Sequence, residues 1–440
     1  MKIPEKGTNP DDVMEMLKRA RASDAAWRRG RTFSLVYWAD EEHTDLLKRA
    51  YCEYFSENGL SPLAFPSLRK FETEVIAMAA DLLGGDSNCC GSLTSGGTES
   101  ILMAVKTARQ WARKNRPDVE KPEILVPRSA HPAFYKAAHY LDVGVRLIPL
   151  ASDFRADANA AREMIGPNTV MVVGSAPAFP HGVVDPIESL AKLAQDNGIL
   201  CHVDACLGGF LLPWLRQLGV DVPPFDFTVP GVTSISADIH KYGFAAKGAS
   251  CIVYRSAHLR RSQYYAWCDW PGGIYVSPTM TGTRPGGAIA AAWACLQHLG
   301  REGYLRIAEK IMKTSERLKQ AISSIPGLRI LGQPPASVFA FTMEDGDVYL
   351  LGELMQQRGW HLDRLQDPAA LHIMVTPVHE GVVDDFASDL AECTAEARAR
   401  SGEPVSGMAA VYGMMAAIED RSQAEEIAID FLSQLMTLQG

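Results

Sequence analysis

Residues 236–243 read Ser236-Ala-Asp-Ile-His-Lys-Tyr-Gly243, and the interpretation of the whole chain begins from them. Lys241 comes just after an apolar run, Val232–Ala237, which predicts a buried strand, and Cys251–Tyr254 predicts its hairpin partner. An amine that a strand carries into a concave interior loses water, which lowers its pKa and makes it a nucleophile at neutral pH. The alternative is a surface lysine at a turn, and the other motifs have to decide between the two.

The composition is that of an ordinary globular protein and excludes several classes. The 440 residues are enough for one large domain and a smaller one, and 47% of them are hydrophobic. A formal net charge of -9 argues against a general nucleic-acid binder, which would be basic. Nine irregularly spaced cysteines favour reduced thiols in the cytoplasm, and the adjacent pair Cys89-Cys90 lacks the spacing of a metal site.

The N-terminal stretch Met1–Arg31 is charged throughout, so it does not resemble a signal peptide. No apolar run is long enough to span a membrane. These two observations predict a cytoplasmic protein without a membrane span.

Strands and helices are expected to alternate between residues 123 and 203. The predicted elements, in chain order, are the strand Glu123–Pro127, the helix His131–Leu141, the strand Val145–Leu150, the helix Ala158–Ile165, the strand Thr169–Ser175, the helix Pro186–Asp196 and the strand Ile199–Val203. This order predicts an α/β fold with a mostly parallel sheet covered by helices on both faces. Ligands of such sheets bind at the carboxyl ends of the strands.

The rest of the chain predicts further units around this sheet. Residues 1–60 are expected to form an N-terminal arm and helical segment, 61–300 a large domain, 301–400 a smaller α+β domain and 401–440 a helical tail. Other expected features are helices at Asp11–Ala22, Phe71–Leu83, Ala288–Leu299, Glu302–Ser324, Val348–Arg358, Gly381–Ala399 and Met408–Leu438, strands at Ser337–Met343 and His372–Val378, and a loop at Pro62–Arg69. The short extended piece Thr32–Trp38 is interpreted either as an arm that packs on a partner subunit or as a layer on its own domain.

Leu93–Ser100 is a Ser/Gly/Thr turn that opens an amphipathic helix, Ile101–Lys114. Free backbone N–H groups and the positive end of the helix dipole meet at Gly97 and Thr98, which predicts a phosphate seat. The alternative is an ordinary helix cap. A second Gly/Pro-rich loop, Thr281–Gly287, also precedes a helix and is another candidate anion seat.

Three polar features fall at the expected strand ends. His131 could stack on a flat aromatic ring, Ser175 begins a loop that could reach a ring hydroxyl, and Asp204 could pair with a pyridinium nitrogen. Each has a structural alternative: a capping histidine, a proline-bearing connection and a hydrogen-bond acceptor for a loop. Together with Lys241 and the phosphate seat, they favour pyridoxal 5'-phosphate (PLP) bound to the lysine as a Schiff base.

The combined pattern resembles the fold-type I (aspartate-aminotransferase-like) PLP enzymes, in the group that holds the amino-acid decarboxylases. Within that group it is similar to the sphingosine-1-phosphate lyase family from about Phe33 to about Ala395. The motifs that carry this resemblance are Thr94–Ser100, Ser129–His131, Pro180–Gly182, His202–Phe210, Gly231–Asp238, His240–Gly243 and Ser277–Thr279 with Gly282–Gly287. The membrane-spanning N-terminal segment of the eukaryotic enzymes has no counterpart here, which implies a soluble, bacterial-type member.

The resemblance implies a homodimer with shared active sites and a role for each matched residue. Lys241 would bind PLP covalently, and His131 would stack on its ring. Asp204 would pair with the ring nitrogen and Cys206 would pack beneath the ring. The residues implied to hold the PLP phosphate are His240, Gly97, Thr98 and, from the second subunit, Thr283. Tyr37 from the partner's arm and Lys247 would face the substrate phosphate.

The implied reaction is a retro-aldol cleavage of a phosphorylated long-chain amino alcohol into a long-chain aldehyde and ethanolamine phosphate, with Lys241 or Tyr37 as the base. The loop Leu60–Leu63 departs from the family, because Ser61 and Leu63 replace a histidine and an aspartate near the substrate phosphate; Thr283 where serine is common is milder. An amino-acid decarboxylase, or a lyase for another amino substrate, therefore remains an alternative. A binding protein of this fold without turnover is a third reading, and it would take up no PLP.

Overall fold

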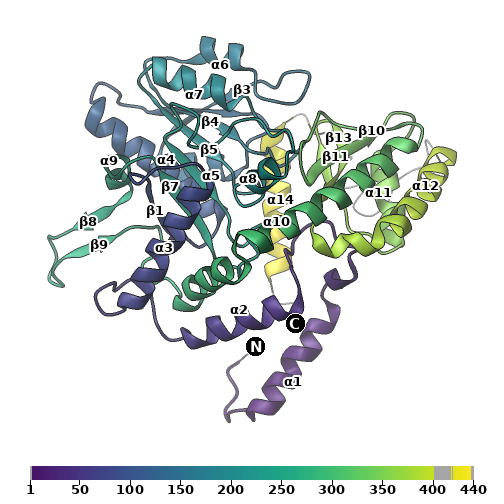
Figure 1. Cartoon of the computed structure of the whole chain (residues 1–440), viewed down its shortest axis with the longest axis horizontal. Coiled ribbons are helices and arrows are strands. Elements are labelled where there is room, and N and C mark those ends of the chain that lie inside the picture. The colour runs from purple at the N-terminus through teal and green to yellow at the C-terminus, as the bar shows by residue number, and fades with distance from the viewer. Residues whose placement is uncertain (1, 401–417, 419, 438–440) are drawn as a thin grey trace.

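The computed structural model describes residues 2–400, 418 and 420–437 (Figure 1). Its larger sheet has the strand order β1-β7-β6-β5-β4-β2-β3. The strands are β1 (Cys90–Thr94), β7 (Ser250–Tyr254), β6 (Ser234–Ala237), β5 (Leu200–Asp204), β4 (Thr169–Ser175), β2 (Glu123–Pro127) and β3 (Gly144–Ile148). From β6 to β3 all neighbours are parallel, whereas β7 is antiparallel to both β6 and β1. The predicted mostly parallel sheet and the β6–β7 hairpin are confirmed.

Helices cover both faces of this sheet. On one face, Leu125 and Val172 belong to a buried cluster that includes Ile187 and Leu190 of α7 (Ile187–Asp196). On the other face, alternate strand residues pack against α4 (Gly97–Asn115) and α5 (Ala133–Leu141) in a second cluster. Because both faces are buried, the strands are nearly continuous apolar runs, as expected of parallel sheets.

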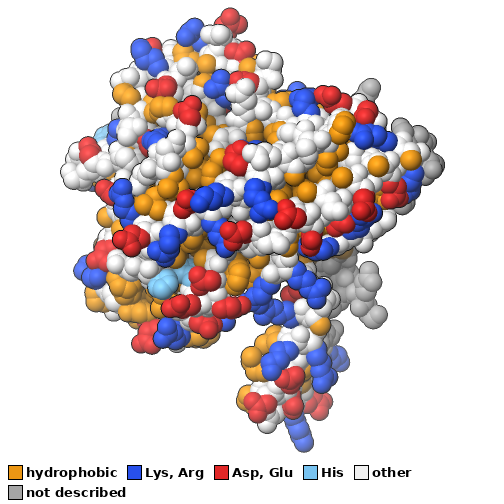
Figure 2. Space-filling view, turned by 45° about the vertical axis from the view of Figure 1, so that its right-hand side comes forward, with side chains coloured by type: hydrophobic (Ala, Val, Ile, Leu, Met, Phe, Trp, Pro, Cys, Tyr) orange, Lys and Arg blue, Asp and Glu red, His pale blue; other side chains and the backbone are white. Residues whose placement is uncertain are grey.

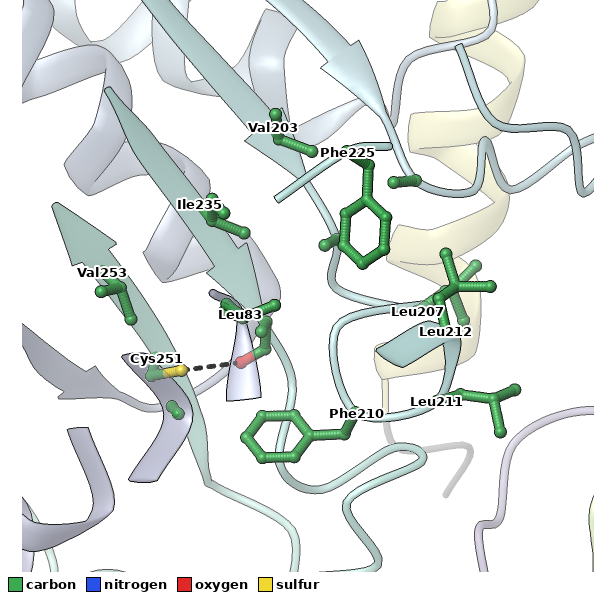
Figure 3. Close-up of a cluster of buried hydrophobic side chains, with 14 of the residues drawn as sticks. Leu83, Val203, Leu207, Phe210, Leu211, Leu212, Phe225, Ile235, Cys251 and Val253 are labelled. Atoms are coloured by element: carbon green, nitrogen blue, oxygen red, sulfur yellow. Dashed lines mark hydrogen bonds between the residues drawn. The ribbon is translucent and has the colours of Figure 1, made fainter. Parts of the chain in front are cut away.

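The centre of the larger core lies under the strands that lead to Lys241. Val203, Ile235 and Val253 are in register across β5, β6 and β7, and all three are buried. Figure 3 shows them with Phe210 and Phe225 in the same cluster. This packing fixes the positions of the carboxyl ends of β5 and β6, and therefore where the segments after these strands begin.

The larger unit has further helices, of which α3 (Pro66–Leu82) and α10 (Gly286–Ser324) differ from the prediction in their bounds. The others are α2 (Glu41–Glu53), α6 (Ala158–Met164), α8 (Leu212–Gln217) and α9 (Ala257–Arg260). The loop expected at Pro62–Arg69 ends at Phe65, since proline at the first helical position lacks only an N–H that would be unpaired there. The two helices expected on either side of residue 300 are present within α10 and meet at a kink, where Gly300 has a non-helical conformation.

A smaller α+β unit follows α10, and its sheet is fully antiparallel. The strands are β10 (Leu328–Ile330), β11 (Val338–Met343), β13 (Ala369–Met374) and β12 (Asp363–Gln366), in that order. Two helices cover it, α11 (Val348–Gln357) and α12 (Val383–Ala399), and a separate hydrophobic cluster joins them to the sheet. The strands β10 and β12 were not predicted, since they are short and only partly apolar.

The extended piece at 32–38 packs on its own chain. Phe33 is fully buried, pairs with the backbone of His361 and Met374, and stacks on His379 with ring centroids 4.4 Å apart. The structure therefore shows this piece as a layer on its own chain, and its packing on a partner subunit stays a prediction. In contrast, α1 (Pro10–Ala20) buries no residue and extends from the body of the molecule (Figures 1 and 2).

The end of the chain is described only in part. The helix α14 (Arg421–Met436) falls within the predicted tail helix Met408–Leu438, whose residues 408–417, 419 and 438 lie outside the described residues. Across the described residues, no helix combines the length and the apolar character that a membrane crossing requires.

Candidate active site

A cavity of about 540 Å³ lies at the carboxyl ends of the parallel strands, as the sequence predicts for a ligand site. The segments that follow β1, β2, β4, β5 and β6 all contribute to its wall. The predicted site residues that line it are Tyr37, Gly97, Thr98, His131, Ser175, Asp204, Cys206, His240 and Lys241. Nine residues that come from distant parts of the sequence therefore converge on one chamber.

Lys241 lies just beyond β6, where the backbone turns after Ala237. Its Nζ is 2.9 Å from Oδ2 of Asp238, whose side chain is almost completely buried. Burial alone would lower the pKa of Lys241, but the Asp238 carboxylate outweighs it and raises the pKa above its ordinary value. The expected lowered pKa of Lys241 is therefore wrong, because the carboxylate of Asp238, which had been given no role, pairs with the amine.

Asp204 is the last residue of β5 and is 7% exposed. Its Oδ1 accepts hydrogen bonds from the backbone N–H of Cys206 at 3.1 Å and from the Ser236 hydroxyl at 3.4 Å. These donors fix the carboxylate at the cavity wall. A carboxylate held in this way can pair with a protonated pyridine nitrogen.

Two histidines at the wall are neutral at neutral pH. Nδ1 of His131 accepts a hydrogen bond from the Ala133 N–H, and its ring remains open to the cavity while desolvation lowers its pKa. Nδ1 of His240 accepts from the Ala249 N–H, and burial lowers the pKa of His240 to about 4. In both rings the proton therefore resides on Nε2, which can donate a hydrogen bond.

The predicted phosphate seat lies where α4 begins. The helix starts at Gly97, directly after β1 and the residues Ser95 and Gly96, so its first N–H groups are free for an anion. A Cβ on Gly97 would lie 2.8 Å from Oδ2 of Asp238 and 2.8 Å from Sγ of Cys206, which leaves no room for a side chain. A Cβ on Gly96 would be 3.4 Å from Cε1 of His240, so the histidine is adjacent to the seat.

Two buried polar atoms at the cavity wall have no hydrogen-bond partner among the residues that the structure describes. They are the Ser175 hydroxyl and Oδ1 of Asp238. Unpaired buried polar atoms are uncommon and call for an explanation, which a polar ligand in the chamber provides. With the anion seat, the open imidazole face, the Asp204 carboxylate and the Lys241 amine, the residues present fit PLP.

Tyr37 reaches the cavity of its own chain. Its hydroxyl donates to Sδ of Met374 at 3.3 Å, and burial raises its pKa above the ordinary value. This placement differs from the expectation that the arm delivers Tyr37 to a partner's site. Lys247 does not line the chamber, but its Nζ lies 5.2 Å from the centroid of the Tyr37 ring and donates to the Leu35 carbonyl.

Ser61 and Thr283 lie away from the cavity of their own chain. Ser61 lines a different cavity of about 790 Å³, together with Arg69 and Arg284. Thr283 lines a small cavity of about 80 Å³ beside Ser95. Within one chain, the structure therefore does not bring either residue into the site.

Further residues at the wall were given no role from the sequence, among them Asp238, Glu99, Phe179 and Met374. Asp238 and Glu99 both belong to quoted motifs, so their position beside Lys241 and Gly97 could have signalled them. Phe179 and Met374 also line the chamber. No local pattern marks these two, since Met374 ends a strand of the smaller sheet.

Buried histidines outside the chamber lining predict that the protein loses stability in mild acid. Burial lowers the pKa of His181, His372 and His379 from 6.5 to about 4, so the unfolded state binds more protons between these values. Stability is complete above pH 6.5 and is lost as the pH falls towards 4, by about 1–2 kcal/mol per histidine at pH 5. Asp185, whose pKa burial raises to about 6, acts in the opposite direction and offsets part of the loss.

Urea unfolding at pH 7.5 and pH 5 measures this effect. We expect a clearly lower free energy of unfolding at pH 5. Equal values at the two pH values would show that these histidines are not held neutral by the fold.

The fold and the site together define a PLP-dependent enzyme of fold type I. Residues 4–343 match the family described as the pyridoxal-dependent decarboxylase conserved domain. The chain is 43% identical over 438 residues to the sphingosine-1-phosphate lyase of Arabidopsis thaliana. The aligned region covers 98% of this chain and 80% of that protein. It is also 43% identical over 440 residues to the sphingosine-1-phosphate lyase of Dictyostelium discoideum. The aligned region covers 99% of this chain and 82% of that protein.

The solved structure of the sphingosine-1-phosphate lyase from Burkholderia pseudomallei superposes with a TM-score of 0.91 at 40% identity, and covers 99% of this chain and 97% of that chain. The chain belongs to the pyridoxal-dependent decarboxylase family and, within it, to the sphingosine-1-phosphate lyases. It is a PLP-dependent lyase, which confirms the family and cofactor implied by the motifs.

Proposed function

We propose that the chain cleaves sphingosine 1-phosphate, or a similar phosphorylated long-chain base, into a long-chain aldehyde and ethanolamine phosphate. The observation that carries this proposal is the convergence of Lys241, Asp204 and the anion seat at Gly97 on one chamber. The proteins named as sphingosine-1-phosphate lyases that match almost the full chain support the choice of substrate.

In this proposal each residue has one task. Lys241 would hold the cofactor covalently through its amine, His131 would stack on the cofactor ring, and Cys206 would pack beneath that ring. Asp204 keeps the ring nitrogen protonated. The residues that hold the cofactor phosphate are Gly97, Thr98 and His240, with the Ser175 hydroxyl available to the ring. PLP, when bound, supplies a protonated ring that takes up the electrons of the bond that breaks.

The cleavage also needs a base that removes the proton of the substrate's 3-hydroxyl group. Tyr37 is a weak candidate, because its raised pKa keeps the hydroxyl protonated at neutral pH. A protonated hydroxyl can instead donate a hydrogen bond to the substrate. The Asp238 carboxylate likewise raises the pKa of Lys241 and keeps its amine protonated, so both residues stay candidates for the base, a role that typically contributes about 10²–10⁴-fold to the rate.

Lys247 is proposed to contact the substrate phosphate as a point charge beside Tyr37. Because Lys247 is exposed, Lys247→Ala is expected to raise KM about 3- to 10-fold and to leave kcat nearly unchanged. Steady-state kinetics at low and high salt measure both parameters. Lys136→Ala is the matched control, since Lys136 is also exposed, lies 5.6 Å from a tyrosine ring centroid and does not line the chamber. An unchanged KM in Lys247→Ala would count against the role.

We also propose a homodimer with shared active sites, in which Thr283 and Ser61 act in the partner's chamber. Neither residue lines the chamber of its own chain, which supports this assignment. The hairpin β8 (Tyr265–Trp267) and β9 (Tyr275–Ser277) gives further support, because Trp267 and Val276 are about half exposed on it. A monomeric molar mass in solution, together with full activity, would contradict the proposal.

Two further points stay predictions. The first is the set of domain bounds at residues 60, 300 and 400. The bound at residue 300 falls inside α10, at the non-helical position Gly300. The cytoplasmic location is the other, and it is favoured by the free state of all nine cysteines.

The substrate assignment is tested against its main alternative by a panel of amines. Purified PLP-loaded protein is incubated with a phosphorylated long-chain base and, separately, with amino acids. Aldehyde release from the first, without CO₂ from the second, supports the proposal. CO₂ release from an amino acid would favour a decarboxylase and would direct attention to Ser61 and Leu63.

A further inference from the structure

Glu99 is a buried carboxylate at the wall of the chamber, in the first turn of α4 and 7% exposed. It forms no ion pair among the described residues, so its charge is balanced by hydrogen bonds. A buried charge of this kind is stable only where several donors surround it.

The donors to Glu99 come from two separate segments. Oε2 accepts from the backbone N–H and the hydroxyl of Ser95, both at 2.7 Å. Oε1 accepts from the backbone N–H of Met280 at 2.9 Å and of Thr281 at 3.4 Å. One side chain therefore ties the turn before α4 to a loop that is 181 residues away in sequence from Glu99.

The two segments are the two candidate anion seats. Ser95 directly precedes Gly96 and Gly97, whose backbone borders the chamber, and Thr281 is two residues before Thr283. Ser95, Thr281 and Thr283 line the same small cavity, so the two seats are adjacent. Without Glu99, four donors would lose their acceptor and the Ser95 turn could change its position.

We propose that Glu99 is a positioning residue that clamps the phosphate seat at residues 95–98 to the Thr281–Thr283 loop. It fixes the direction of the free N–H groups at the start of α4 and contributes to the retention of PLP. The carboxylate itself does not touch the phosphate, since its oxygens are directed to Ser95, Met280 and Thr281. This inference rests on the proposed PLP-dependent function.

The test is the variant Glu99→Gln. Its amide group has an NH2 donor in the place of one carboxylate oxygen, which is an acceptor. The dissociation constant of PLP is measured from the visible absorbance of lysine-bound cofactor, and its rate of release is measured after dilution. We expect PLP to bind about 10-fold more weakly or worse and to dissociate faster. Amide exchange at Met280 and Thr281 is expected to accelerate in the same variant.

Asp226→Asn is the matched control. Asp226 is also buried, accepts from the backbone N–H and the hydroxyl of Thr228, and pairs with Arg216 at 2.9 Å, but it does not line the chamber. It should lower the melting temperature without changing PLP affinity. If Glu99→Gln does not fold, Glu99→Asp replaces it, because the shorter side chain keeps the charge and loses the reach.

The outcomes separate the two proposals. Wild-type protein that takes up no PLP would contradict the proposed function. Wild-type protein that binds PLP, with a folded Glu99 variant of equal affinity and equal rate of release, would overturn the role of Glu99 alone. A weaker affinity in the Glu99 variant but not in Asp226→Asn supports it.

Discussion

Lys241→Ala is expected to abolish turnover, with a loss in kcat of about 10⁴-fold or more. In the proposed function the nucleophile is the amine of Lys241, which lies in the chamber beside Asp238, Asp204 and the anion seat. Lys247 lies outside the chamber and lacks this setting. The expected effect is therefore a loss of both covalent cofactor attachment and reaction, without loss of the fold.

Borohydride reduction followed by mass measurement distinguishes these effects. Wild-type protein and Lys247→Ala should each gain the mass of one reduced PLP per chain, and Lys241→Ala should gain none. Far-UV circular dichroism of the three proteins should agree. Cofactor trapped on another residue, or retained turnover in Lys241→Ala, would remove Lys241 from its assigned role.

Asp204→Asn has the second-largest expected effect, a loss in kcat of about 10²–10³-fold. An amide has nearly the same shape as the carboxylate but carries no charge to keep the ring nitrogen protonated. The anion seat at Gly97 and the Lys241 amine are unchanged in this variant, so PLP should still bind. The loss should therefore appear in kcat much more than in cofactor occupancy.

Asp204→Glu helps to interpret the result, since it keeps the charge and lengthens the side chain by one methylene. Partial recovery of kcat in Asp204→Glu relative to Asp204→Asn would indicate that charge is the important property. A kcat in Asp204→Asn within about twofold of wild type would be incompatible with the electron-sink assignment.

The sequence predicted the larger sheet well where burial on both faces leaves an unambiguous pattern. Glu123–Pro127 and Thr169–Ser175 have the predicted bounds, because each is a continuous apolar run between turns. Strands with a weaker signal, such as Asp363–Gln366, were missed, since pairing with a neighbouring strand rather than their own residues makes them strands.

The site was predicted where a motif places a functional group at a strand end. Lys241, Asp204 and His131 all follow such ends and line the chamber. The electrostatic state of Lys241 could not be predicted in the same way, because it depends on the distance to Asp238. The position of Met374 could not be predicted either, since only tertiary packing brings the smaller sheet to the wall of the chamber.

The proposed reaction is tested by an assay of both products from sphingosine 1-phosphate in PLP-loaded protein, with Lys241→Ala as the control. We expect a long-chain aldehyde and ethanolamine phosphate in equal amounts, formed only by the protein with the intact lysine. Protein that visibly holds PLP but forms neither product would contradict the proposed substrate and reaction, while the family and the cofactor would stand.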